Sequence, residues 1–281
     1  MQDALTLLNE NWLGAATPKK HLPALMAIEN VLHPSNQLRF RFSCMVQERS
    51  TTRRNGIDYY DEIVEQIAKV SAVLKQKQPA RLRNLGCDCG ADFAPIAHLL
   101  SRYREDLVVV WFDAHADLNT PASSAGGSPS GHFHGMVLRA LTGHAAFGLS
   151  DHLSPPMLPS QIILAGAREI DPEERDYIAS ESVALVSSED LGQRSWLAAL
   201  DASAALGITN AYIHIDFDVL DPEEFPWVGC PAPGGISTET LRLAVAQVYD
   251  RFDVRGVSAV EISADEDNAI QAANIAVGLI A

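Results

Sequence analysis

The sequence predicts an α/β protein with a largely parallel central sheet, and three observations lead to this prediction. From about residue 57 onward, short continuous apolar runs alternate with amphipathic segments. The apolar runs have the length of strands, and continuous runs of this kind suit strands that are covered on both faces. Polar residues with metal-binding chemistry follow two of the runs, where open α/β sheets place their ligand sites. Strands that alternate with helices imply βαβ units and a largely parallel sheet.

The amphipathic segments have the spacing of helices. In GIDYYDEIVEQIAKVSAVLK, residues 56–75, apolar residues recur every three or four positions, as on one helix face, and Asp58 is a candidate N-cap. Further helices are expected at about 91–104, 134–142, 172–180, 193–206, 238–250 and 267–280.

The apolar runs predict the strands. LVVVWF at residues 107–112 is the clearest example. The others are QIILAGA (161–167), VALVSS (183–188), AYIHIDF (211–217) and GVSAVEI (256–262).

Residues 1–56 are harder to assign. HLPALMAIENVL (21–32) is compatible with a helix and LRFRFSCMV (38–46) with an alternating strand, but the polar residues between them fix little. We expect one domain over residues 1–281, because α/β folds often exceed the usual domain size.

Composition and charge limit the classes of partner. The formal charge of −15 would repel nucleic acid and anionic lipid over about 8 Å at physiological salt. No apolar stretch approaches the length of a membrane span, and the N-terminus lacks the features of a secretory signal. Four cysteines in such a chain suggest reduced thiols. We therefore expect a cytoplasmic protein with neither nucleic acid nor membrane as a partner.

The first candidate site follows the run 107–112. There the chain reads Asp-Ala-His-Ala-Asp, which places Asp113, His115 and Asp117 at alternate positions. Side chains alternate faces in an extended chain, so these three could converge on one side. A lone aspartate at a strand end is also a common turn or helix cap, and the string by itself decides nothing.

A second string, AYIHIDFDVLD, repeats the pattern. Asp216 and Asp218 share one face with Tyr212 and His214. If the two strings meet, four carboxylates with ordinary pKa values near 3.9 would all be ionised at pH 7 and would repel one another. Metal ions are the simplest remedy. Carboxylates with one or two imidazoles favour Mn²⁺, and so many carboxylates can bridge two ions about 3.5 to 4 Å apart.

These residues resemble motifs of the ureohydrolase family, which comprises arginases, agmatinases and formiminoglutamases. WFDAHADLNTP resembles its second metal segment, SGHFHG its histidine loop, HIDFDVLDP its third metal segment and GVSAVEISA its glutamate segment, in this order from about residue 84 to 265. The resemblance implies a three-layer α/β/α arginase-like fold and a manganese-dependent enzyme. It implies that a metal-bridging hydroxide between two Mn²⁺ ions hydrolyses a guanidino C–N bond and releases urea or hydroxyurea.

The resemblance also implies roles for single residues. Glu261 would hold the planar guanidinium through two hydrogen bonds, and His134 would pass a proton to the departing amine. The alternatives are an exposed charge at a strand end and a surface histidine. The metal ligands would be Asp113, His115, Asp117, Asp216 and Asp218, with Asp117 also taken as catalytic.

The substrate end is less firmly implied. Asn119 and Ser130 would contact an α-carboxylate and Asp171 an α-amino group, which favours arginine or a close relative over agmatine. Against this, His132 stands where arginase has asparagine, and Cys230 where it has threonine. An agmatinase or formiminoglutamase activity therefore stays open. His214 matches no catalytic position of the family, and we expect it to pack or to support the ligands.

Cys89 is the main departure from the family. The first metal segment of the family, Gly-Gly-Asp-His, reads Gly86-Cys87-Asp88-Cys89 here, so Cys89 occupies the position of a histidine ligand. A thiolate is softer than imidazole and suits Zn²⁺ or Fe²⁺ better. One metal position is thus expected to be weakened or altered, unless Cys89 only packs, as buried cysteines commonly do and as we expect of Cys87.

A cysteine at this position also resembles the branch of the family that hydrolyses Nω-hydroxy-L-arginine in D-cycloserine biosynthesis. Hydroxyarginine is therefore a candidate substrate beside arginine. The same replacement leaves open a non-catalytic, ureohydrolase-like binding protein. The resemblance further implies a homo-oligomer, a trimer or a hexamer.

Overall fold

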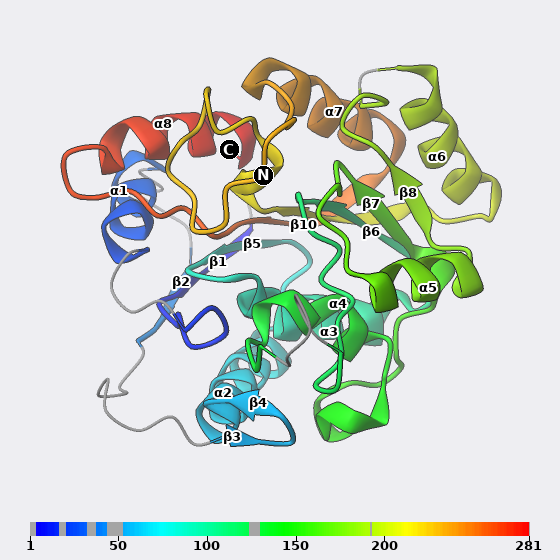
Figure 1. The fold of residues 1–281 in the computed structure, drawn as a ribbon. Coiled ribbons are helices and arrows are strands. Elements are labelled where there is room, and N and C mark those ends of the chain that lie inside the picture. The colour runs from blue at the N-terminus through cyan, green and yellow to red at the C-terminus, as the bar shows by residue number, and fades with distance from the viewer. Residues whose placement is uncertain are drawn as a thin grey trace.

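A single sheet of eight parallel strands runs through the middle of the molecule (Figure 1). The structure is a computed structural model that describes residues 4–16, 21–32, 38–43, 53–123, 130–191 and 193–280. The strands, in their order across the sheet, are β2 (Arg39–Phe42), β1 (Leu5–Asn9), β5 (Leu82–Gly86), β10 (Asp253–Ala259), β9 (Asn210–Ile215), β6 (Leu107–Phe112), β7 (Ile162–Ala165) and β8 (Ala184–Val186).

Helices cover both faces of this sheet (Figure 1). One layer contains α1 (Leu22–Leu32), α6 (Arg194–Ala205), α7 (Thr238–Arg251) and α8 (Ala269–Ile280). The other contains α2 (Tyr60–Lys77), α3 (Phe93–Tyr103) and α4 (Val137–Leu141), and α5 (Pro172–Glu181) connects β7 to β8. The predicted three-layer α/β/α fold with a largely parallel sheet is confirmed. Within the part of the chain described, no helix is both long and apolar enough to span a membrane.

The sequence located the central strands better than the N-terminal ones. Every residue of β6 and β9 is buried, as the continuous apolar runs predicted. Strand β1 was not predicted, although it pairs with β5 over its whole length. Asp58 was wrongly expected to cap α2: it lies in β4 (Ile57–Asp58), which pairs with β3 (Arg53–Arg54), and its carboxylate binds the Arg53 guanidinium.

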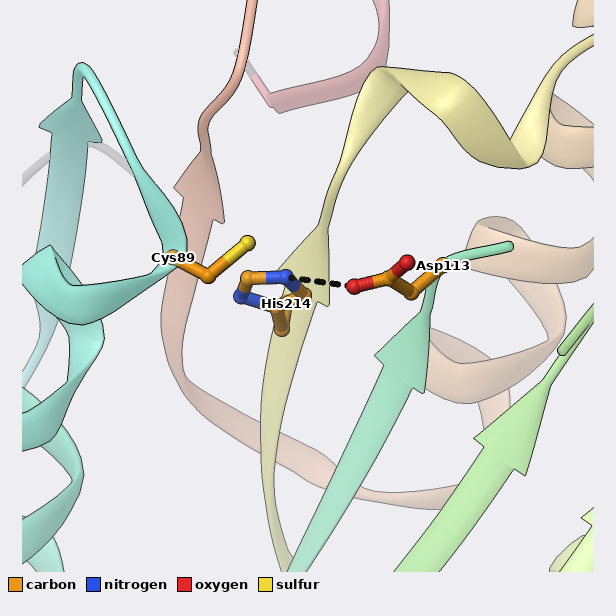
Figure 2. Close-up of side chains that lie close together, drawn as sticks. All are labelled: Cys89, Asp113 and His214. Atoms are coloured by element: carbon orange, nitrogen blue, oxygen red, sulfur yellow. Dashed lines mark ion pairs between the residues drawn. The ribbon is translucent and has the colours of Figure 1, made fainter. Parts of the chain in front are cut away.

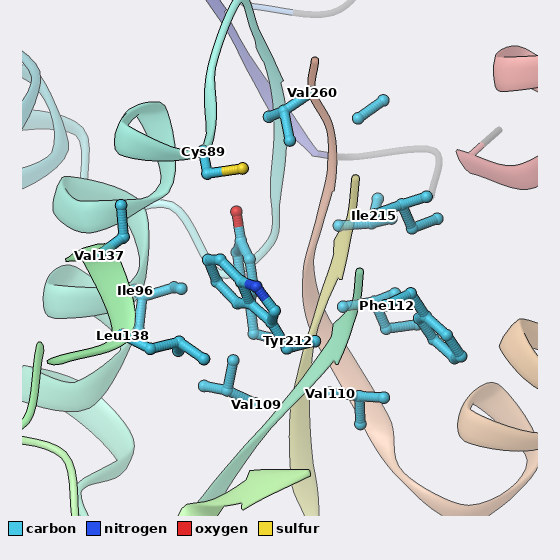
Figure 3. Close-up of a cluster of buried hydrophobic side chains, with 14 of the residues drawn as sticks. Cys89, Ile96, Val109, Val110, Phe112, Val137, Leu138, Tyr212, Ile215 and Val260 are labelled. Atoms are coloured by element: carbon cyan, nitrogen blue, oxygen red, sulfur yellow. The ribbon is translucent and has the colours of Figure 1, made fainter. Parts of the chain in front are cut away.

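The core beneath the candidate site is packed on both sides of β6 and β9 (Figure 3). Ile96 and Leu138, from α3 and α4, pack on the side of the sheet that carries Tyr212. Phe112 and Ile215 point to the opposite side. Cys89 lies at the end of this cluster that borders the candidate site (Figure 3). The site is therefore built on a rigid, close-packed base.

A glycine lets the Tyr212 ring lie flat across the neighbouring strand. Gly256 of β10 pairs with Tyr212 of β9, and a Cβ at Gly256 would meet the ring at 2.3 Å. The ring has no room to move, because it is fully buried and its hydroxyl is hydrogen-bonded to Asp92. Only a residue without a side chain fits at this point of close approach.

We predict that Gly256→Ala destabilises the protein by about 1 to 3 kcal/mol, because the added methyl overpacks a core that cannot yield. Urea denaturation followed by circular dichroism measures this change. Gly278→Ala is the matched control: it adds the same methyl within α8, where no atom lies within 4 Å. An equal effect of the two substitutions would contradict the prediction.

Candidate metal centre and active site

Four adjacent strands end at one edge of the sheet and bring the predicted site together. Strands β5, β10, β9 and β6 are neighbours and run parallel, so their carboxyl ends meet at the same edge. The residues that follow these ends are, in strand order, Cys89, Glu261, Asp216 with Asp218, and Asp113 with His115 and Asp117.

The residues after β6 converge, but not by the alternation of an extended strand. The strand ends at Phe112 and the chain turns: Asp113 Oδ1 accepts a hydrogen bond from the His115 amide at 2.7 Å. Asp117 then adopts a left-handed backbone with φ of 52°. Its carboxylate lines a cavity, and its Oδ2 is buried without a hydrogen-bond partner among the described residues. The expected alternation of an extended strand is therefore replaced by a turn at Asp113 and a left-handed residue at Asp117.

His115 joins the carboxylates of the two strings. Its Nδ1 lies 3.0 Å from Asp218 Oδ2 and 3.4 Å from Asp113 Oδ1. The ligand atoms of these three residues all lie within 4.8 Å of one another, which is compatible with one shared cation. The 3-10 helix η7 (Phe217–Val219) sets the second string, because Asp216 Oδ1 accepts from the Asp218 amide at 2.8 Å.

Burial of so many carboxylates perturbs their ionisation. Burial raises the pKa of Asp216 well above its usual range, and the charge of Asp218 adds to the effect. Burial and the charge of Asp113 raise the pKa of Asp117 well above its usual range and that of Asp218 to about 6. For Asp113, burial opposes ionisation, but His115 and His214 outweigh it and lower the pKa. Protein cations alone therefore do not balance the cluster.

Cys89 lies inside this cluster. The residue is 1% exposed and begins the 3-10 helix η1 (Cys89–Asp92), which follows β5. Its Sγ lies 3.3 Å from Asp216 Oδ2 and 3.9 Å from Glu261 Oε1. Burial, with the charges of the surrounding carboxylates, raises the pKa of the thiol well above its ordinary value. Cys87, Cys89 and Cys230 form no disulfide, and Cys44 lies outside the described residues.

His134, which is partly exposed, and the buried Glu261 form a pair beside the cluster. His134 Nδ1 lies 3.0 Å from Glu261 Oε1. Burial opposes charge on both groups, but their mutual interaction outweighs it, so the pKa of His134 is raised and that of Glu261 is lowered. Glu261 has a left-handed backbone with φ of 60°, which turns its side chain into the site. Its other oxygen lies 3.8 Å from Nε2 of His21, a residue that sequence reasoning did not single out.

A cavity of about 540 Å³ opens over these groups. At its rim, Asn119 Nδ2 donates to Asp171 Oδ2 at 2.9 Å, and Asn119 Oδ1 accepts from Ser123. Asp171 also begins α5 in a capping box with Glu174, whose pKa burial raises to about 7. All predicted site residues except the fully buried Asp113 line this cavity: Cys89, His115, Asp117, Asn119, Ser130, His134, Asp171, Asp216, Asp218 and Glu261.

A buried polar network below the cluster was largely missed from the sequence. His214 stacks on Trp111, its cross-strand neighbour, with ring centroids 3.3 Å apart. His214 Nδ1 lies 2.5 Å from Asp92, and Trp111 Nε1 donates to Asp113 at 3.0 Å. The alternation of Tyr212 and His214 with apolar residues was the available signal, but nothing in the sequence identifies Asp92 as their partner.

The residues present fit divalent cations. The crowded carboxylates need positive charge, and two buried acceptor-capable atoms, Asp117 Oδ2 and His214 Nε2, have no hydrogen-bond partner among the described residues. Carboxylate oxygens with imidazole nitrogen are ligands that Mn²⁺ accepts, and the thiol adds a softer donor. Three groups of possible ligands occur there, and they share members: Cys89 with Asp113 and His214, Cys89 with Asp216 and Glu261, and Asp113 with His115 and Asp218.

Comparison with known proteins agrees with the fold and the motifs. The family model described as "Arginase family" matches residues 33–281. Arginase from Staphylococcus aureus (strain MRSA252) is 28% identical over 243 residues, which cover 83% of this chain and 78% of the relative. Arginase from Bacillus subtilis (strain 168) is 30% identical over 219 residues, which cover 75% and 71%.

A solved structure extends the likeness over the whole chain. The arginase of Entamoeba histolytica in complex with L-ornithine has a TM-score of 0.80 at 19% identity, with 100% of this chain and 99% of that chain covered. At this identity the likeness speaks for the fold alone. The family model, which matches most of the chain, decides the relationship: this protein belongs to the arginase family.

Proposed function

We propose that this chain is a metal-dependent ureohydrolase that cleaves a guanidino C–N bond of arginine or of a close relative such as Nω-hydroxy-L-arginine. The observation that carries the proposal is the His134–Glu261 pair, which lines the same cavity as the carboxylate cluster. A carboxylate that would bind guanidinium and a histidine that would exchange protons are thereby placed beside a cluster that needs cations. Family membership supports the same reading.

The proposed metal centre consists of two divalent ions, Mn²⁺ at one position at least. When bound, the ions would supply a water of lowered pKa, which makes hydroxide available near neutral pH. The proposed ligands are Asp113, His115, Asp117, Asp216, Asp218 and Cys89. The thiolate of Cys89 makes the metal position that it contacts softer than the other.

Glu261 and His134 have separate proposed roles, in binding the guanidinium and in transferring a proton. Glu261 carries negative charge because its pKa is lowered, and a guanidinium can pair with it through charge-assisted hydrogen bonds that orient the carbon for attack. The Nδ1 of His134 is held by Glu261, which leaves Nε2 for proton transfer. The raised pKa of His134 keeps a proton available for the departing amine near neutral pH.

The rim favours an amino acid over a simple amine. Asn119 Nδ2 uses one of its two N–H groups for Asp171, so the second can donate to a substrate carboxylate. The Asp171 carboxylate can accept from an α-amino group. Agmatine would keep the contact with Asp171 but would have no carboxylate for Asn119 or Ser130. Assembly into a trimer or hexamer stays a prediction, which the mass of the protein in solution tests.

We predict that Glu261→Gln lowers kcat/KM for arginine by about 100-fold or more, because hydrogen bonds to a charged group contribute about 1.5 to 3 kcal/mol each. Urea release by the manganese-loaded protein measures the rate. Glu266→Gln, an exposed residue before α8, is the matched control and should keep the wild-type rate. The proposed function fails if a panel of arginine, hydroxyarginine, agmatine and formiminoglutamate yields no product, or if Glu261→Gln equals wild type.

Asn119→Ala tests the substrate end separately. We expect kcat/KM for arginine to fall about tenfold, the effect of one lost hydrogen bond to a carboxylate, while the value for agmatine changes less. The ratio of the two rates in wild type and variant isolates the contact with the carboxylate. Equal losses for both substrates would show that Asn119 only holds Asp171 in place, and a preference of the wild type for agmatine would refute the amino acid substrate.

A further inference from the structure

His214 occupies an unusual position for a packing residue. It is fully buried on β9, directly below the carboxylate cluster, and its ring lies flat on Trp111 with an interplanar angle of 1°. The stack and the strand fix the plane of the ring. The ring therefore presents its two nitrogens in fixed directions, Nδ1 toward Asp92 and Nε2 toward Asp113.

Asp92 determines which ring nitrogen carries the proton. Its Oδ1 accepts from Asn84 at 2.6 Å and from Tyr212 at 2.7 Å, and its Oδ2 accepts from Ser258 at 2.5 Å. His214 Nδ1, 2.5 Å from Oδ2, is the fourth partner of a carboxylate that offers only acceptors. Nδ1 is therefore a donor, and in the neutral ring Nε2 then holds a lone pair.

That lone pair has no hydrogen-bond partner among the described residues, although Nε2 is fully buried. An unsatisfied buried acceptor costs about 1 to 3 kcal/mol, so such an atom calls for an explanation. Asp113 Oδ2 lies 3.8 Å away, beyond hydrogen-bond range. Figure 2 shows the Cys89 sulfur close to the His214 ring, and the sulfur, one ring nitrogen and an Asp113 oxygen all lie within 4.8 Å of one another.

We propose that His214 is a metal ligand, which together with Cys89 and Asp113 surrounds one cation of the centre. Neighbouring ligand atoms of a tetrahedral ion with bonds of about 2.1 Å lie about 3.4 Å apart, which is within the 4.8 Å limit that these three atoms satisfy. Asp92 then plays the part of the carboxylate that commonly accepts the second N–H of a metal-bound histidine. The imidazole missing at position 89, which follows β5, is supplied instead from β9, two strands away in the sheet. The inference rests on the metal centre of the proposed function.

This ligand set has a consequence for metal choice. Thiolate and imidazole favour Zn²⁺ or Fe²⁺, whereas the set of Asp113, His115 and Asp218 contains harder donors that suit Mn²⁺. The two positions of the centre thus differ in preference, with the softer ion at Cys89 and His214. A conventional alternative is that His214 only orients Asp113 by its charge and binds no metal.

Zinc affinity gives the first test. We expect His214→Asn, which keeps an amide near Asp92 but has nothing at Nε2, to weaken Zn²⁺ binding about 100-fold or more, since loss of an outer partner alone costs 10- to 100-fold. Competition with a chelator measures the affinity, and manganese affinity should fall much less. His152→Asn, which removes a histidine outside the cavity lining, should leave both unchanged. Unchanged zinc affinity in His214→Asn would overturn the inference.

X-ray absorption at the zinc edge separates a ligand from a residue that only orients Asp113. In a His115→Asn background, bound zinc should show sulfur at about 2.3 Å and imidazole nitrogen at about 2.0 to 2.1 Å. Adding His214→Asn should remove the imidazole signal and keep the sulfur. An imidazole signal that persists, or that is missing from the His115→Asn protein, refutes ligation by His214.

The two proposals fail in distinguishable ways. If wild-type protein binds neither zinc nor manganese, the metal centre of the proposed function is wrong. If it binds metal and hydrolyses a guanidino substrate, but zinc shows no imidazole in the His115→Asn protein, only the inference about His214 is wrong. The zinc spectrum of the His115→Asn protein decides whether His214 is a ligand, even if the His214→Asn variant fails to fold.

Discussion

The crowding of carboxylates at one sheet edge is the constraint on which the rest of the site depends. Parallel β5, β10, β9 and β6 end together, and the residues after them carry more negative charge than His115 and His134 can balance. This excess of negative charge contributes to the raised pKa values of Asp117 and Asp216. Divalent cations would resolve it, and the chemistry proposed for the cavity would follow from their binding.

The base of the site is built to keep these groups in place. Tyr212 and His214 are held from below by Asp92, and the absence of a side chain at Gly256 lets the Tyr212 ring lie flat. Trp111 stacks on His214 and donates to Asp113, so one network joins the core to the first carboxylate of the cluster. Such support from buried partners fixes the geometry of ligands that would otherwise repel one another.

Much of this arrangement was predictable from the sequence. Apolar runs placed the central strands, and the alternate Asp and His residues after two of them located the cluster, because strand ends of a parallel sheet meet at one edge. The turn at Asp113 and the left-handed backbone of Asp117 and Glu261 were not predictable, since local hydrogen bonds and tertiary contacts set them.

Partners distant in sequence were equally hidden. Asp92 contacts residues 120 or more positions away, Tyr212 and His214 among them, and no local pattern connects them. Strand β1 was not predicted either, because its five residues, all of them buried, are too few to show a recognisable hydrophobic pattern. Only its pairing with β5 identifies it as a strand. The chemistry of single residues was thus easier to foresee than the contacts that orient them.

The number of metal ions bound per chain tests the central claim most directly. Elemental analysis after loading with Mn²⁺ and Zn²⁺ and removal of free metal should give close to two ions per chain, with a higher unfolding temperature than the chelator-treated protein, since ligands of the folded state stabilise it. Fewer than one ion per chain, with an unfolding temperature that chelator does not change, would contradict the claim that this carboxylate cluster is a metal centre.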